Sequence, residues 1–223
     1  HVMNSPENSL YYSFDVARLR GRAGSVGLVL QCVLPALAWA GGESRFEILG
    51  GTHALWAPPS HYLQEVFLPT LSRMGLSAEL KTLRWGWYPK GGGVVRGCVR
   101  PVRCLNGIDL TERGALREVR GLSAVSNLPR SIAERQRARV LTRLEVEGIP
   151  ASVELVDAPA AGQGTFVFLT LHYEGVVAGF SALGARGKPA ERVADEVVDA
   201  ALAFVRSSAA VDSTWQTSSS PTW

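Results

Sequence analysis

Three consecutive glycines, at 91–93, constrain this chain more than any other feature. They follow the segment Arg-Trp-Gly-Trp-Tyr-Pro-Lys at 84–90, which places two tryptophans and a proline next to them. Glycine lets the backbone turn through positive φ or approach a ligand or another strand closely, and a preceding proline stiffens the entry. We do not expect core packing to explain this composition. A sharp connection between two strands is the alternative to a ligand-binding role.

Two further motifs precede this segment in the chain. They are Ala-Gly-Ser-Val-Gly-Leu-Val-Leu-Gln at 23–31 and Gly-Gly-Thr-His-Ala-Leu-Trp-Ala-Pro-Pro at 50–59. With 84–95, and with Asn127 to Arg130 further on, they resemble the RNA 3'-terminal phosphate cyclase family from about Phe14 to Val211. The resemblance implies an α+β fold, with repeated βα units whose helices pack on mixed sheets, plus a small α/β insert domain.

The resemblance also implies a domain organisation. Core repeats occupy 1–117, with the first one incomplete, the insert domain occupies 118–180, and a third repeat begins over 181–211. The family's N-terminal Gly-rich segment and its C-terminal repeat with the nucleophilic histidine have no counterpart here, so we expect a truncated member. The polar stretch 212–223 is typical of a disordered tail. A frameshift is the other interpretation, because a back-translation of this stretch with GC-rich codons, read in another frame, encodes a peptide that resembles a family segment.

Alternating periodicities predict the helices and strands. We expect a helix over 60–74, with Ser60 as its N-cap and Gly75 at its end, and a basic helix that a capping box of Ser131 and Glu134 opens. A last helix, over 189–206, should carry an apolar stripe left partly exposed by the missing repeat. Its members are Val193, Val197, Ala201 and Val205. The other expected elements are a helix at 24–39 and strands at 45–49, 78–85, 94–102 and 152–156.

Composition indicates a folded protein without a membrane segment. The 223 residues are 46% hydrophobic and 19% charged, with a net charge of +3. No apolar run reaches the roughly 18 to 20 residues that cross a bilayer. Three cysteines, Cys32, Cys98 and Cys104, lack metal-ligand spacing, which predicts reduced thiols in a cytoplasmic protein and no metal site. Composition leaves the oligomeric state open.

The family's reaction, which the resemblance implies, uses ATP and a divalent metal, Mg²⁺ or Mn²⁺. A histidine attacks the α-phosphorus, AMP passes to the 3'-phosphate of an RNA, and the neighbouring 2'-oxygen displaces AMP to give a 2',3'-cyclic phosphate. The expected partner is therefore RNA with a 3'-phosphate end. Because none of the four histidines stands at the nucleophile's position, we assign no catalytic residue.

Three residues match family positions that contact the nucleotide. Gln31 can donate and accept hydrogen bonds, and Pro58 and Tyr62 offer flat surfaces to an adenine. Taken alone, Gln31 could be a polar residue that caps a core edge, and Pro58 could belong to an ordinary helix entry. The surrounding motifs favour the nucleotide-binding interpretation for Gln31, while both interpretations of Pro58 remain open.

Some positions depart from the family pattern. His53 replaces an Asp or Asn, Trp85 replaces a basic residue, and Ala17 to Gly21 resembles extra sequence. The first two raise doubt about an intact phosphate-handling surface.

A group of arginines is concentrated in the predicted insert domain. They could follow an RNA backbone, or they could form a solvated helix face paired with Glu134, Glu145 and Glu147. The residues are Arg130, Arg135, Arg137, Arg139 and Arg143.

Three functions fit this sequence. The first is an ATP-dependent RNA 3'-phosphate cyclase of the ligase class, with chemistry impaired in this chain. The second is a non-catalytic cyclase-like protein that binds RNA or assembles ribosomes, and the third is an inactive fragment. Gln31 and the segment 87–93 favour cyclase ancestry.

Overall fold

The computed structural model describes residues 2–4, 10–16, 24–54 and 56–214. The proposed extra sequence at 17–21 and most of the tail lie outside these ranges. The chain forms two compact units. The first consists of His1–Ile108 with Pro159–Gly162, and the second of Asp109–Ala158 with Gln163–Trp223.

The first unit is built on a mixed sheet in the order β1-β2-β3-β5-β4. Strands β2 and β3 are parallel, and the other neighbours are antiparallel. Side chains alternate between the two faces, so Phe46, Ile48, Val95 and Val99 are buried while Arg45 and Arg96 are exposed. The strands are β1 (Val2–Asn4), β2 (Leu10–Asp15), β3 (Ser44–Gly50), β4 (Ala78–Arg84) and β5 (Gly93–Val99).

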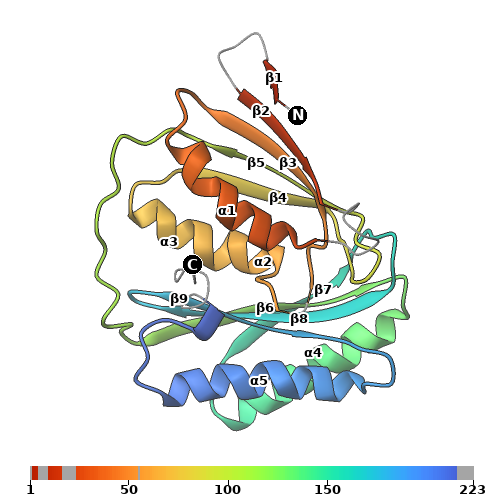
Figure 1. Cartoon of the computed structure of the whole chain (residues 1–223). Helices are drawn as coiled ribbons and strands as arrows, with labels where there is room; N and C mark the ends of the chain where they lie inside the picture. The colour runs from red at the N-terminus through yellow and green to blue at the C-terminus, as the bar shows by residue number, and fades with distance from the viewer. Residues whose placement is uncertain (1, 5–9, 17–23, 55, 215–223) are drawn as a thin grey trace. The chain divides into compact units, whose positions relative to one another are not determined.

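Helices cover the apolar face of this sheet (Figure 1). The first is α1 (Val26–Ala38), whose N-cap residue Ser25 accepts a hydrogen bond from the Leu28 amide at 3.3 Å. A second helical stretch contains α2 (Ser60–Tyr62), the π-helical η1 (Leu63–Phe67) and α3 (Leu68–Arg73). Gly75 follows it with φ of +96°, which confirms the predicted glycine stop.

The predicted cap of this second stretch is wrong. Its N-cap residue is Pro59, and Ser60 is already the first helical residue. Proline has no amide hydrogen and favours the extended conformation found at Pro59, with ψ of 156°, so it can start a helix without a side-chain cap. The two prolines therefore form a helix entry, which does not decide between the two interpretations of Pro58.

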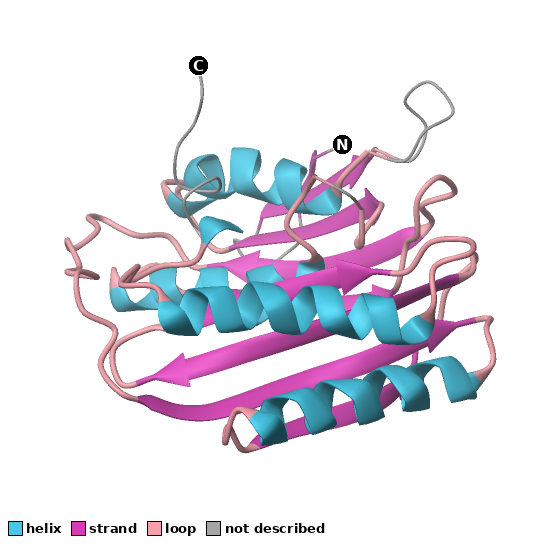
Figure 2. Ribbon diagram, turned by 90° about the horizontal axis from the view of Figure 1, so that it is seen from below, coloured by secondary structure: helices cyan, strands magenta, loops and turns pink. Residues whose placement is uncertain are grey.

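The second unit has a four-stranded mixed sheet in the order β7-β6-β8-β9. Helices α4 (Arg130–Val146) and α5 (Ala190–Arg206) lie side by side on one face of it (Figure 2). Strands β6 and β7 are parallel, and the other neighbours are antiparallel. The strands are β6 (Leu116–Ser126), β7 (Ala151–Asp157), β8 (Gly164–Tyr173) and β9 (Val177–Leu183).

The stripe on α5 is buried, contrary to the expectation from the sequence. Val193, Val197 and Ala201 are at most 1% exposed, and Val205 packs against the same apolar cluster. The cluster joins α5 to α4, β8 and β9, because the sheet supplies an apolar face on which both helices pack. The packing therefore places 181–206 in one core with 118–180. The assignment of these segments to an insert and a third repeat stays a prediction.

The predicted capping box on α4 is also wrong. Pro129 is the N-cap residue, and α4 starts at Arg130 without a side-chain cap within the described range 56–214. Glu134 instead lies 3.5 Å from the Arg130 guanidinium in an i,i+4 ion pair.

Both units combine mixed sheets with helices packed on them, so the predicted α+β class is confirmed. The described part of the chain has no helix long and apolar enough to span a membrane. All three cysteines are free thiols in the structure.

Candidate functional site

Two glycine-rich segments of the first unit meet at Gly86. The amides of Thr52 and His53 donate to the Gly86 carbonyl, at 3.0 and 3.2 Å, and the Gly86 amide donates to Thr52 Oγ1 at 2.9 Å. A Cβ atom on Gly86 would lie 2.3 Å from the carbonyl oxygen of Gly50 and 2.5 Å from the amide of Gly93. The glycines are therefore required because backbone packs directly against backbone here.

The structure corrects the interpretation of the tryptophans beside these glycines. Trp85 and Trp87 are 5% and 4% exposed, so core packing does explain them. Gly91 and Gly92 have φ of +64° and +75° between β4 and β5, so the strand-connection interpretation of the glycine run is confirmed. The Trp85 amide also donates to Pro159 O at 2.8 Å, which ties 159–162 to the first unit.

Two histidines fill the space beside these tryptophans. The His53 ring stacks on Trp85, with centroids 4.1 Å apart, and His53 is 1% exposed. His53 Nδ1 lies 2.8 Å from Thr52 Oγ1, and His53 Nε2 lies 3.0 Å from His61 Nδ1. Both nitrogens of His53 are thus hydrogen-bonded inside the core, which leaves neither placed to attack a phosphorus atom.

Burial sets the charge of this histidine pair. It lowers the pKa of His53 well below its ordinary value, and a charge on His61 would lower it further. Burial also lowers the pKa of His61 to about 4. Both imidazoles are therefore neutral at pH 7, and one ring donates to the other. The sequence alone gave no signal for this bond, because the partners are separated by a loop and a helix start.

The loop after Thr52 runs against the N-terminal half of α1. The Val26 amide donates to Gly51 O at 2.9 Å, and the Gly51 amide donates to Gly24 O at 2.8 Å. A Cβ atom on Gly27 would lie 2.3 Å from Pro58 O. Gln31 is one helical turn beyond Gly27, so the structure brings Gln31 and Pro58 to the same face of α1.

Gln31 carries an unsatisfied donor on this face. Its Nε2 atom is buried, and within the described ranges it has no hydrogen-bond acceptor. A buried amide that only capped the edge of the core would be expected to bond to a protein carbonyl. The orphaned donor instead favours a ligand that brings an acceptor, which is what the nucleotide-binding interpretation requires.

The two other predicted nucleotide contacts differ in accessibility. Pro58 is half-buried beside α1, with surface open to a ligand. Tyr62 is 1% exposed in the core of the first unit. Stacking of Tyr62 on an adenine would therefore need a movement that uncovers the ring.

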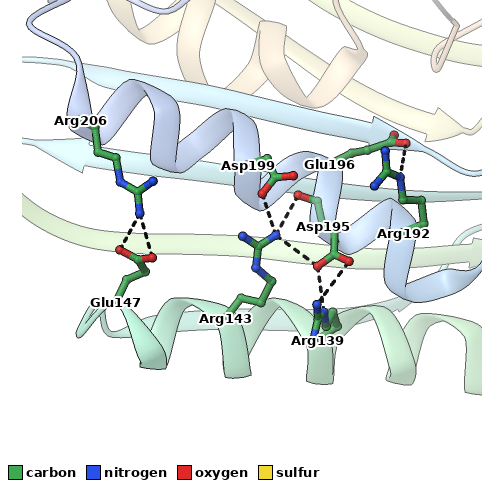
Figure 3. A network of polar contacts seen from close by, with 8 residues as sticks. All are labelled: Arg139, Arg143, Glu147, Arg192, Asp195, Glu196, Asp199 and Arg206. Carbon is green, nitrogen blue, oxygen red and sulfur yellow. Dashed lines mark hydrogen bonds and ion pairs between the residues drawn. The ribbon is translucent and has the colours of Figure 1, made fainter.

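Three of the five arginines considered for RNA binding are paired with acidic side chains of α5, and Figure 3 shows the pairs of Arg139 and Arg143. Arg135 binds Glu191 at 2.7 Å, Arg139 binds Asp195 at 2.8 Å, and Arg143 lies between Asp195 and Asp199. Partner numbers rise together along both helices, so α4 and α5 run in the same direction. The paired-face interpretation is confirmed, but the partners come mainly from α5 rather than from the glutamates expected.

Metal ligands are not gathered in the described residues. No group of three or more His, Cys, Asp or Glu side chains there could hold an ion. The described residues therefore do not fit a protein-only site for Mg²⁺ or Mn²⁺.

Comparison with known proteins places the chain in a family. Residues 2–221 match the family model described as RNA 3'-terminal phosphate cyclase. A protein of that name from Gloeothece citriformis is 43% identical over 95% of this chain and 61% of its own length. Those from Methylococcus capsulatus and Pyrococcus furiosus are 48% and 38% identical, over 90% and 86% of this chain and 56% of each relative. The chain thus spans about three-fifths of the relatives' length, and it belongs to the RNA 3'-terminal phosphate cyclase family.

Proposed function

We propose that this chain is part of an RNA 3'-terminal phosphate cyclase, which uses ATP to convert an RNA 3'-phosphate to a 2',3'-cyclic phosphate through adenylylated intermediates. The substrate is RNA with a 3'-phosphate end, and the setting is RNA processing or repair in the cytoplasm. Support comes from the shared family and from relatives that carry the cyclase name over most of this chain. That agreement favours the cyclase over a non-catalytic RNA-binding or ribosome-assembly protein.

The orphaned Nε2 of Gln31 is the observation that carries the proposal to ATP. It would donate to an acceptor of the nucleotide, while Pro58 supplies a flat apolar surface beside it. ATP supplies AMP, whose attachment turns a terminal phosphate into an electrophile with a good leaving group. The task of this region of the chain is to bind and orient the nucleotide.

The nucleophile and the metal are not assigned to residues of this chain. His53 and His61 are neutral and bonded to each other, and His172 lies 3.0 Å from Thr170 Oγ1. The described residues hold no group of three or more side chains that could bind the Mg²⁺ or Mn²⁺ implied by the family.

Nucleotide binding is tested with Gln31→Leu. This variant should lower ATP affinity by about tenfold, since one hydrogen bond to the ligand is lost. It should keep or slightly raise the free energy of unfolding, because an unsatisfied buried donor disappears. Cys32→Ser, at an exposed neighbouring position of α1, is the matched control and should bind ATP normally. A destabilised Gln31→Leu with normal ATP affinity would instead establish the core-edge role.

Catalysis is tested by incubation with α-labelled ATP and Mn²⁺, followed by denaturing electrophoresis. Label on this chain would show that one of its own side chains accepts AMP. A labelled full-length relative beside an unlabelled chain would restrict this chain to nucleotide binding.

A further inference from the structure

Trp56 projects from the loop that carries Pro58. Its side chain is 96% exposed, the highest value among the large apolar side chains that the structure describes as exposed. A tryptophan normally buries most of its surface, so full exposure of the largest aromatic side chain costs stability. Trp85 and Trp87 of the same unit show the usual pattern, since both are buried.

The backbone at Trp56 is also in an unfavourable conformation. Its φ is +65°, in the left-handed region that favours glycine and, after it, asparagine. Such outliers persist where the surrounding structure holds them, and they gather at binding sites. Here the Thr52 amide is bound to Gly86 O at 3.0 Å, and the Ser60 amide to Thr52 O at 3.0 Å, so both ends of the loop are fixed.

The neighbours of Trp56 indicate what its ring would contact. Ala57 and Pro58 follow it directly, and Pro58 O lies against Gly27, one turn from the unsatisfied Gln31 amide. Ala54, Ala57 and Pro58, which are described neighbours of Trp56 in the chain, are half-buried. A single flat ring next to a polar nucleotide site suits a flat ligand better than an apolar protein surface.

We propose that Trp56 is a stacking residue for a nucleobase at the edge of this site. The proposal rests on the proposed function, because it takes the ligands to be RNA and ATP. Tryptophan offers the widest π-face of any side chain, and base stacking tolerates any sequence, as an enzyme acting on RNA ends requires. The base can come from the RNA strand or from ATP, and the two sources are separable by experiment.

The test compares Trp56→Asn with Trp56→Phe. Asparagine tolerates positive φ, so Trp56→Asn keeps the loop conformation and removes the ring, while Trp56→Phe keeps a ring. Trp39→Ala is the control, because Trp39 is 53% exposed at the other end of α1. Fluorescence anisotropy would measure binding of a short single-stranded RNA with a 3'-phosphate, the same RNA without its terminal bases, and labelled ATP.

We expect Trp56→Asn to weaken binding by about tenfold, Trp56→Phe to remain within about threefold of the wild type, and Trp39→Ala to bind normally. A loss limited to the RNA identifies an RNA base, and a loss limited to ATP identifies the adenine. The proposal is overturned if Trp56→Asn binds both ligands like the wild type, whether tightly or not at all. The proposal is also overturned if the wild type binds the RNA without its terminal bases as tightly as the complete RNA and Trp56→Asn binds ATP normally.

The stacking role and the nucleotide site can fail separately. If Gln31→Leu binds ATP normally while Trp56→Asn still loses RNA affinity, the assignment of Gln31 falls and the stacking residue stands. If Gln31→Leu loses ATP affinity and Trp56→Asn loses nothing, the nucleotide site stands and the stacking role falls.

Discussion

His53 Nε2 and His61 Nδ1 are 3.0 Å apart, and this contact joins the loop of the glycine-rich segment to the first turn of α2. One hydrogen lies between these nitrogens, and the bond is lost once both rings are protonated, because each nitrogen then carries a hydrogen and no acceptor remains. The contact therefore makes the first unit sensitive to acid.

We expect the first unit to lose stability as the pH falls below 6.5. An unfolded histidine takes up a proton near that pH, whereas folded His61 does so only near pH 4, so the unfolded state binds more protons in between. For His61 the loss should reach about 2 kcal/mol at about pH 5, and the lowered pKa of His53 adds a loss of the same sign. Urea unfolding at several pH values measures it. The double variant His53→Asn/His61→Gln should show a shallower acid limb, and an unchanged limb would contradict the prediction.

Thr52→Val should destabilise the first unit by about 1–3 kcal/mol, because the buried Gly86 amide loses its acceptor while the volume is kept. Thr52→Ser retains the hydroxyl and should cost much less. Thermal unfolding compares the two. A smaller loss for Thr52→Val than for Thr52→Ser would show that the methyl group, rather than the hydrogen bond, matters at this position.

Gly27→Ala should displace the loop at Pro58, because the new methyl group would lie 2.3 Å from a carbonyl oxygen. We expect a loss of about 1–3 kcal/mol, and weaker ATP binding if the proposed site is correct. Gly41→Ala is the matched control, since nothing lies within 4 Å of its added atom. Chemical denaturation measures both variants, and similar stability for the two would refute the close approach.

Arg113→Lys should loosen the end of α5. The guanidinium donates to four carbonyl oxygens, of Phe204, Val205, Ser207 and Ala209, and lies over the rings of Tyr173 and Phe204. An ammonium group cannot reproduce this planar set of bonds, so we expect a loss of about 2–4 kcal/mol and faster amide exchange at 204–209. Arg117→Lys alters an exposed ion pair and should cost under about 1 kcal/mol. Equal exchange rates would argue against this cap.

Asp195→Asn should weaken the contact between α4 and α5. Asp195 is 22% exposed and pairs with both Arg139 and Arg143, so we expect a loss of about 1 kcal/mol at low salt and less at 1 M NaCl. Glu134→Gln, in a pair whose side chains are 61% and 55% exposed, should cost less at either salt concentration. A loss from Asp195→Asn that is independent of salt would show that packing, rather than charge, holds the helices together.

Local patterns predicted most of the elements. Periodicity located the helices at 26–38, 60–73 and 190–206 and the strands around the glycine run to within a few residues. The caps were mispredicted at Ser60 and Ser131, since a proline one or two residues before each serine starts the helix. Side-chain capping is a preference that a favourable backbone can replace.

The candidate site was harder to predict, because its contacts join distant segments. Gln31 and Pro58 were identified by resemblance, yet the core packing of Trp85 and Trp87 was missed because the sequence does not show that the His53 ring packs against both. Burial of the α5 stripe was missed for the same reason. Which surface a helix covers depends on packing partners that can lie anywhere in the chain.

Assignment of Pro159–Gly162 to the first unit has a consequence for dissecting this protein. Neither unit is a continuous stretch of chain, so one cut after Ile108 removes the carbonyl of Pro159 that the Trp85 amide binds. Two fragments made by a single cut would therefore both be imperfect, because the first would lack 159–162 and the second would carry these residues without the unit to which they belong. A clean separation would need a gene rearrangement that returns this short segment to the piece with which it folds.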